Sequence, residues 1–188
     1  EYLNQHLKVS ATCWFLDRLV NMVEEGVDVA VRIAELPDSS LQAISVGRMR
    51  LVTCASPAYL ARQGLPRTLA DLASHNIVCA GAVAPGHELR FSQDGRSRVL
   101  KMQPRLATTT NESAVAAAVS DFGLTQQMLY KVAEPLARGQ LQEVLCDFEP
   151  PALPVHVLHR EGRYASRRVR AFLDLAIERL RALPELQA

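Results

Sequence analysis

The amino-acid sequence predicts an α/β fold, because short β-like segments alternate with segments of helical periodicity along most of the chain. The 188 residues are 48% hydrophobic, which provides enough apolar material for one or two compact cores. Strands that alternate with helices predict a largely parallel sheet with helices on its faces. Such sheets bind ligands at the carboxyl ends of their strands.

The first elements predict a βαβ unit. Residues 7–12 have the pattern of a strand, and residues 27–33 alternate as a second strand after Gly26 has ended a helix. The helix is predicted from apolar residues at helical spacing, namely Leu16, Leu19, Val20 and Val23.

Two further strands and a capped helix follow. The strands are predicted at residues 41–46 and 49–55. Ser56 and Pro57 are typical of the N-cap and first turn of a helix, which Gly64 ends.

The stretch 77–106 consists of short β-like segments. Asp94 and Gly95 predict a hairpin turn between strands at residues 89–92 and 99–102.

The remaining segments predict a helix, a strand and a final helix. The first of these helices has Asn111 as its predicted N-cap and Gly123 as its end. A strand at 155–158 follows a stiff proline-rich connector. The final helix is predicted from one apolar stripe, formed by Val169, Phe172, Leu173, Ala176, Ile177, Leu180 and Leu183.

Charge and composition narrow the function classes. The net charge of +1 gives no chain-wide attraction to nucleic acid or anionic lipid. No apolar run reaches the roughly 18–20 residues that cross a bilayer, and the first residues lack the features of a signal peptide. The cysteines (Cys13, Cys54, Cys79 and Cys146) are widely spaced, as expected of reduced thiols. A cytoplasmic location without a membrane partner is therefore expected.

Motifs for catalysis or metal binding are missing. The sequence has no G-x-S-x-G elbow, dinucleotide fingerprint, P-loop or H-E-x-x-H motif, so we expect no enzyme, no cofactor and no metal site. Cys54 lies in an apolar strand, which favours a structural thiol over a nucleophile. His156 and His159 are three apart on a strand and point to opposite faces. The basic cluster of Arg160, Arg163, Arg167, Arg168 and Arg170 fits a solvated helix face better than a phosphate site.

Two polar edges are candidate ligand sites. The first is the turn after residues 27–33, with Arg32, Glu35 and Ser39 around it. The second is the start of the helix at Asn111, where Thr108, Thr109 and Thr110 precede the helix and Thr125, Gln126 and Gln127 follow it. Glu35 favours a cationic or hydroxylated ligand, whereas a helix start favours an anion. The alternative is that the polar residues only cap the helix.

Several segments, in order and spacing, resemble the effector-binding domain of LysR-type transcriptional regulators. They are residues 28–41 (Asp-Val-Ala-Val-Arg-Ile-Ala-Glu-Leu-Pro-Asp-Ser-Ser-Leu), 54–60 (Cys-Ala-Ser-Pro-Ala-Tyr-Leu), 71–75 (Asp-Leu-Ala-Ser-His), 130–141 and 170–174. The resemblance covers nearly the whole chain.

The resemblance implies a periplasmic-binding-protein-like fold of type 2, with two Rossmann-like α/β lobes joined by two crossover strands. The crossings are expected near Ala55 and Val155. Lobe one is then residues 1–55 plus 159–188, and lobe two is residues 56–158.

The chain departs from this family in lacking the N-terminal winged helix-turn-helix, its linker helix, and the first strand and most of the first helix of lobe one. It is therefore expected to be a fragment. The family's cleft positions fall on Ala34, Glu35, Thr110, Asn111, Thr125 and Gln126.

The implied function is that of an effector-sensing and oligomerisation domain that controls transcription by ligand-driven lobe closure. Its expected partners are a small-molecule effector and further copies of the chain in a homodimer or homotetramer. DNA would be reached only through the missing N-terminal domain. The alternatives are a free-standing periplasmic-type solute-binding protein and a pure dimerisation module.

Overall fold

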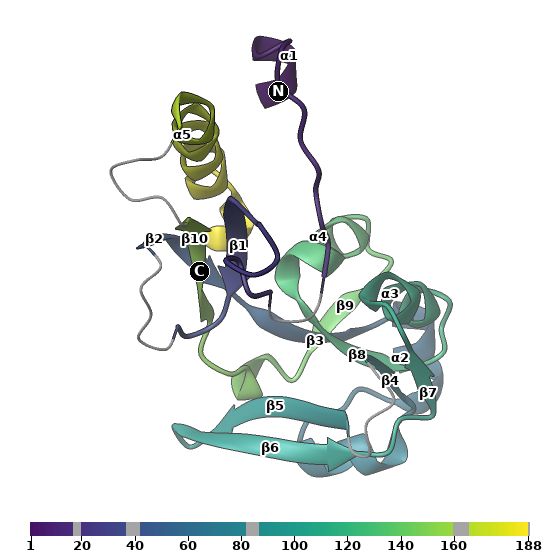
Figure 1. The fold of residues 1–188 in the computed structure, drawn as a ribbon. Helices are drawn as coiled ribbons and strands as arrows, with labels where there is room; N and C mark the ends of the chain where they lie inside the picture. The colour runs from purple at the N-terminus through teal and green to yellow at the C-terminus, as the bar shows by residue number, and fades with distance from the viewer. Residues whose placement is uncertain (17–19, 37–41, 82–86, 160–165, 188) are drawn as a thin grey trace. The chain divides into compact units, whose positions relative to one another are not determined.

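A computed structural model of the protein describes residues 1–16, 20–36, 42–81, 87–159 and 166–187. The chain divides into two compact units, whose elements are labelled in Figure 1. The first unit comprises Glu1–Met49 and Leu153–Ala188, and the second comprises Arg50–Ala152.

The chain passes from the first unit to the second after Met49 and returns after Ala152. Among the described strands, β3 (Leu51–Ala55) pairs with strands of the second unit, and β10 (Leu153–His159) pairs with strands of the first. The division of the lobes at residues 55 and 159 stays a prediction.

The first unit has a small antiparallel sheet. Its described elements are α1 (Tyr2–Gln5), β1 (Val29–Ile33), β2 (Gln42–Met49), β10, α5 (Arg167–Arg181) and the 3₁₀ helix η3 (Pro184–Leu186). The strands lie in the order β1-β10-β2, and both neighbouring pairs are antiparallel. The strands expected at residues 27–33, 41–46 and 155–158 are confirmed, but the expectation of a parallel sheet is wrong for the described strands of this unit.

The βαβ unit expected before β1 is not formed by the described residues. Residues 7–16 contain no strand, residues 22–26 form a turn, and Leu19 lies outside the described residues. Apolar side chains behind the expectation are exposed, Leu7 of the expected strand by 89% and Val23 of the expected helix by 66%. Apolar periodicity produces a stable element only where a partner surface covers it, and these side chains have none among the described residues.

The final helix is confirmed as α5, and α1 packs beside it. Leu173 of the expected apolar stripe is buried. The guanidinium of Arg179 donates two hydrogen bonds to the Glu1 carboxylate, at 2.6 and 2.9 Å. The Tyr2 hydroxyl donates to the Arg168 carbonyl at 2.7 Å. The start of the chain is therefore fastened to its last helix.

The second unit has a mixed sheet and a separate hairpin. Its elements are β3, α2 (Pro57–Gln63), η1 (Leu69–Ser74), β4 (Ile77–Ala80), β5 (His87–Gln93), β6 (Arg96–Met102), β7 (Leu106–Thr108), α3 (Asn111–Val119), β8 (Leu124–Met128), α4 (Leu129–Ala137), β9 (Gln142–Val144) and η2 (Cys146–Phe148). The sheet order is β7-β4-β8-β3-β9. Strands β7, β4 and β8 are parallel, as expected, but β3 is antiparallel to both of its neighbours. Strands β5 and β6 form the hairpin.

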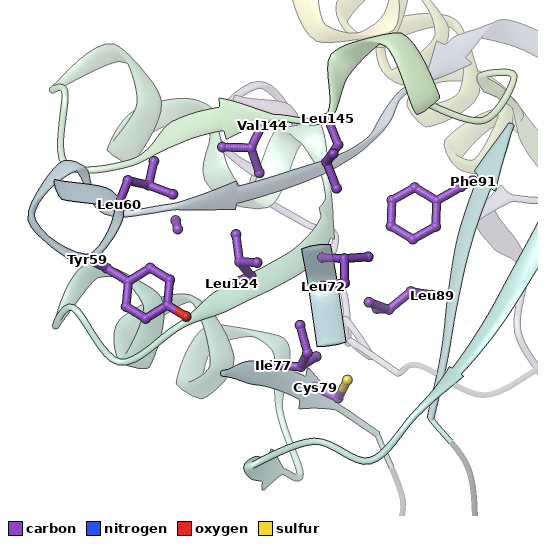
Figure 2. Packing of buried hydrophobic residues seen from close by; sticks show 11 residues of the cluster. Tyr59, Leu60, Leu72, Ile77, Cys79, Leu89, Phe91, Leu124, Val144 and Leu145 are labelled. Atoms are coloured by element: carbon purple, nitrogen blue, oxygen red, sulfur yellow. The ribbon is translucent and has the colours of Figure 1, made fainter. Parts of the chain in front are cut away.

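A hydrophobic core covers each face of this sheet. Figure 2 shows the larger core, with side chains from α2, η1 and strands β4, β5 and β8; its buried members are Ala55, Tyr59, Leu60, Leu72, Ile77, Cys79, Leu89, Phe91, Leu124, Val144 and Leu145. The other core lies under α3 and α4 and contains Val52, Cys54, Ala118, Val132 and Leu141. Each large apolar side chain buried in this way contributes about 1.5–3 kcal/mol.

Two local signals in the sequence are confirmed. The Ser56 hydroxyl accepts a hydrogen bond from the backbone N–H three residues on, at 3.1 Å, Pro57 begins α2, and Gly64 follows its end. Asp94 and Gly95 both have left-handed backbones, with φ of 52° and 70°. A two-residue hairpin turn of type I′ requires positive φ at both positions.

The caps of α3 differ from those expected. Thr110 is the N-cap, because its hydroxyl accepts a hydrogen bond from the Ser113 N–H at 3.2 Å, and Asn111 is the first helical residue. Both residue types are good N-caps, so their order was ambiguous in the sequence. The left-handed residue after the helix is Asp121, with φ of 62°, and not Gly123.

Gly123 instead permits a close approach of two backbone segments. The next amide, that of Leu124, donates to the Asn76 carbonyl at 2.8 Å. A Cβ at position 123 would lie 2.3 Å from that same carbonyl oxygen. Only glycine leaves room for this contact.

Two further expectations concern cysteines and membranes. Cys54 and Cys79 are buried, Cys13 and Cys146 are exposed, and all four are free thiols. Within the described part of the chain, no helix combines the length and apolarity needed to span a bilayer.

A polar cluster forms at the edge of the larger core. The Tyr59 hydroxyl accepts a hydrogen bond from the Asn76 N–H at 2.9 Å and lies 3.1 Å from Nδ1 of His75. Because the hydroxyl already accepts from Asn76, its proton is available for Nδ1, which favours a neutral imidazole. Burial lowers the pKa of His75, and the nearby Asp71 carboxylate only partly offsets this.

We predict that Gly123→Ala destabilises the protein by roughly 1–3 kcal/mol, because the added methyl group forces the two backbone segments apart. Urea unfolding monitored by circular dichroism measures the loss. Ser120→Ala, an exposed change in the same loop, serves as the control and should shift stability by less than about 0.5 kcal/mol. Equal stabilities of the two variants would contradict the close approach.

We predict that His75 lowers the free energy of unfolding as the pH falls. Its pKa is lower in the folded chain than in the unfolded chain, so its contribution is complete above the unfolded pKa of about 6.5 and is lost as the pH falls through the folded pKa. Urea midpoints measured from about pH 7.5 to pH 5 should therefore drop further in the wild type than in His75→Asn, which offers an uncharged acceptor. Parallel pH profiles would show that His75 carries no such effect.

Candidate functional site

The start of α3 is a polar edge whose hydroxyl groups are largely engaged. The Thr110 hydroxyl caps the helix and donates to the Ser113 hydroxyl at 2.9 Å. The Thr108 hydroxyl donates to the Thr110 carbonyl at 2.8 Å. Thr110 is exposed and Asn111 is half-buried. The helix start therefore remains accessible, but Thr110 has a structural role there.

Thr125 and Gln126 of β8 point to opposite faces of the sheet. Thr125 is 1% exposed, and its hydroxyl accepts a hydrogen bond from the side-chain amide of Gln127 at 2.9 Å. Gln126 lies on the other face, where it contacts Thr53 of β3. Because successive side chains in a strand alternate, these two side chains cannot share one face of a ligand site.

The Gln126 side chain fastens the hairpin to the sheet. Its carbonyl accepts from the Arg90 backbone N–H at 2.9 Å, and its amide donates to the Arg90 carbonyl at 2.8 Å and to the Thr53 hydroxyl at 3.2 Å. The sequence contains no signal for this bond, since it joins residues 36 positions apart. Thr53, which is 6% exposed, also had no sequence signal as part of a polar cluster.

The other expected residues follow β1 in the first unit. Ala34 is half-buried and donates its amide to the Pro154 carbonyl at 3.1 Å, while Glu35 is exposed. Ser39 lies outside the described residues. Ala34 and Glu35 therefore belong to one unit, and the four residues expected on α3 and β8 belong to the other.

Unpaired basic groups lie in the sheet of the first unit. Arg32 of β1 and His156 of β10 are direct cross-strand partners. Nε of Arg32 and Nδ1 of His156 are buried and have no hydrogen-bond partner among the described residues, and the same holds for Nδ1 of His159. Arg32 was noted in the sequence beside Glu35, but its pairing with His156 depends on the strand register.

Charge at the site edge comes from α3 and α4. Glu112 in the first turn of α3 lies 3.6 Å from Nζ of Lys131 on α4. A backbone hydrogen bond at the helix start, helped by the Lys131 charge, lowers the pKa of Glu112. The helix start therefore already carries an internal anion.

Two observations concern the side chains considered for nucleophilic or metal chemistry. Burial raises the pKa of Cys54 to about 12, so its thiol stays protonated at neutral pH. No group of His, Cys, Asp or Glu side chains in the described ranges is arranged to hold a metal ion. Of the basic cluster, Arg167, Arg168 and Arg170 are exposed at the start of α5, while Arg160 and Arg163 lie outside those ranges.

Comparison with known proteins identifies the type of domain. The family described as LysR substrate binding domain matches residues 1–181 of the chain. The chain is 31% identical over 176 residues to YhjC, an uncharacterised HTH-type transcriptional regulator of Escherichia coli K12, with 93% of this chain and 59% of that protein covered. It is 29% identical over 163 residues to the HTH-type regulator CrgA of Neisseria meningitidis serogroup B, with 86% and 54% covered. The chain thus spans less than two thirds of the length of these relatives.

Solved structures show the same fold. The CrgA regulatory domain of N. meningitidis, a LysR-type regulator, matches with a TM-score of 0.78 at 24% identity, over 95% of this chain and 88% of that one. Full-length AphB, a virulence activator of Vibrio cholerae, matches with a TM-score of 0.83 at 20% identity, over 95% and 60%.

These neighbours have the two-lobed, periplasmic-binding-protein-like α/β fold, and the relatives are transcriptional regulators, which favours a regulator over a free-standing solute-binding protein. The chain belongs to the LysR substrate binding domain family and corresponds to the regulatory domain of LysR-type transcriptional regulators.

Proposed function

We propose that this domain senses a small-molecule effector by closing its two units around it, and that closure changes transcription through an attached DNA-binding domain. The observation that carries the proposal is the family match over residues 1–181. The division of the chain into two units joined by two crossings supports it further, because such a connection permits one unit to move as a body against the other.

The mechanism is a population shift. An effector that contacts both units binds the closed form better than the open form, and it can shift the equilibrium only by that difference in affinity. Ala34 and Glu35 would contact it from the first unit, and Thr110, Asn111, Thr125 and Gln126 from the second. Thr125, whose side chain is buried, would contact the effector through its backbone. Asn111 would contact it through its side chain.

The remaining parts of the proposal concern partners and location. The domain works in the cytoplasm as part of a homodimer or homotetramer, without a cofactor, and catalyses no reaction. Contact with DNA belongs to a separate N-terminal domain. The regulator names of the relatives support the role in transcription. The protonated state of the buried Cys54 thiol supports the proposal that this residue is not a nucleophile.

The proposed effector is a compact polar molecule. Aromatic residues make up 5% of the chain, which gives little material for stacking on a large flat ring. The contacts proposed above are hydrogen-bonding groups, and the unpaired Arg32 and His156 nitrogens would favour an anionic part of the molecule.

We predict that a thermal-shift screen of small carboxylic acids, amino acids and aromatic compounds finds ligands that raise the unfolding midpoint. A ligand at a hundred times its Kd stabilises the native state by about 2.7 kcal/mol. Asn111→Ala and Glu35→Ala should reduce the ligand-induced rise, and Ser97→Ala on the exposed face of β6 should not. If the whole library leaves the midpoint unchanged, a pure dimerisation module is favoured instead.

We predict that Gln126→Ala releases the hairpin even without a ligand. Backbone amides of β5 and β6 should then exchange with deuterium roughly tenfold faster, because the loss of the side-chain bonds to Arg90 removes about 1 kcal/mol or more. Gln93→Ala near the hairpin turn is the control. If exchange is unchanged but ligand affinity falls, Gln126 acts only as an effector contact.

A further inference from the structure

Both connections between the units leave the first unit at neighbouring places. Strand β2 ends at Met49 and β3 begins at Leu51, so Arg50 is the single residue between strands that belong to different sheets. On the return path, Leu153 of β10 pairs with Met49 in the first unit. The two crossings therefore run side by side where they leave the first unit.

An ion cluster joins the two crossings on the side of the second unit. The Arg50 guanidinium donates two hydrogen bonds to the Glu149 carboxylate, from Nε at 2.8 Å and from Nη2 at 2.6 Å. Nη2 also donates to Glu143 of β9 at 2.8 Å. The side chains of Arg50, Glu143 and Glu149 are 31%, 26% and 18% exposed, so solvent screens these bonds less than it screens surface pairs.

The geometry of this cluster differs from that of an ordinary surface ion pair. Paired hydrogen bonds between a guanidinium and a carboxylate fix the direction of both side chains as well as their distance. The hydrogen bonds to Glu149, and then those to Glu143, raise the pKa of Arg50. The backbone of Arg50 is also held in place, because the Leu129 N–H at the start of α4 donates a hydrogen bond to the Arg50 carbonyl at 2.9 Å.

The residues beyond Glu149 stiffen the second crossing. Pro150 and Pro151 follow it directly, and each fixes its own φ and restricts the residue before it to extended backbone. Glu149 has φ of −60° and ψ of 133°, as this restriction requires. With Arg50 and Glu149 bound together, the freely rotating part of both crossings is confined to the few bonds between them and the Met49–Leu153 pair.

We infer that Arg50, Glu143 and Glu149 form a hinge clamp that fixes where the two units bend against each other. Arg50 is a positioning residue in this role and touches no effector. The inference rests on the proposed function, because a defined bend matters only if the units move. The clamp makes the motion a rotation about one place, so that effector contacts reach the opposite unit in a reproducible geometry.

The test measures the ligand-free 188-residue chain, so it does not depend on finding an effector. Spin labels are placed at exposed positions of α5 and α2 by Asp174→Cys and Ala61→Cys, with Cys13→Ser and Cys146→Ser removing the exposed native thiols. Pulsed electron–electron double resonance then gives the distribution of distances between the two spin labels. Arg50→Met and Glu149→Gln should broaden this distribution, and Arg50→Lys should have an intermediate effect because it keeps the charge without the paired bonds.

A matched control and a local readout make the result decisive. Arg138→Met breaks the exposed Arg138–Glu134 pair of α4 in the same unit and should leave the distribution unchanged. Deuterium exchange at the Leu129 amide should become roughly tenfold faster in Arg50→Met and Glu149→Gln only. Circular dichroism checks whether each variant is folded. If Arg50→Met does not fold, the result for Glu149→Gln decides the test.

The clamp and the proposed function fail in different ways. If the clamp variants keep the wild-type distance distribution and the wild-type exchange at Leu129, the cluster is only a stabilising ion group and the inference is wrong. If the wild-type distribution does not narrow with any ligand of the thermal-shift library, the proposed sensing fails. In that case the ligand-free comparison still decides whether Arg50 controls the bend.

Discussion

Strands β3 and β8 of the second unit are buried on both faces, and the positions of the other groups in that unit depend on this. Cys54 and Ala55 are neighbours in β3 with no exposed surface, yet they belong to different cores. In β8, Leu124 and Thr125 are each 1% exposed and also face opposite sides. Every polar side chain in these strands must therefore find a partner within the protein.

The polar residues of β8 satisfy that requirement in two ways. Thr125 pairs with Gln127 under α3 and α4, and Gln126 pairs with Thr53 and the Arg90 backbone on the hairpin side. Under the proposed function, an effector at the end of this sheet would meet side chains that already have structural partners. Its binding would then be linked to the position of the hairpin through Gln126.

Sequence reasoning was reliable where a signal is local. The Ser56 cap and the Asp94-Gly95 turn were predicted because a few adjacent residues decide them. The strands of residues 27–33 and 155–158 were found from alternation, but not their antiparallel pairing, since pairing depends on distant segments. The N-terminal strand and helix were predicted from apolar spacing alone, and the exposure of Leu7 and Val23 shows why spacing is insufficient. For the candidate site, the sequence did not indicate that Thr125 and Gln126 lie on opposite faces of the sheet.

The sequence by itself determined the α/β class, the Asp94-Gly95 turn, the start of α2 and the family resemblance, because these follow from residue types at short fixed spacings. The tertiary structure alone decided which strands are partners, why Gly123 must be glycine, and that Arg50 meets Glu143 and Glu149, about a hundred positions along the chain. The physical reason is that a side chain's partner across space is chosen by the packing of whole elements. No short stretch of sequence contains that information.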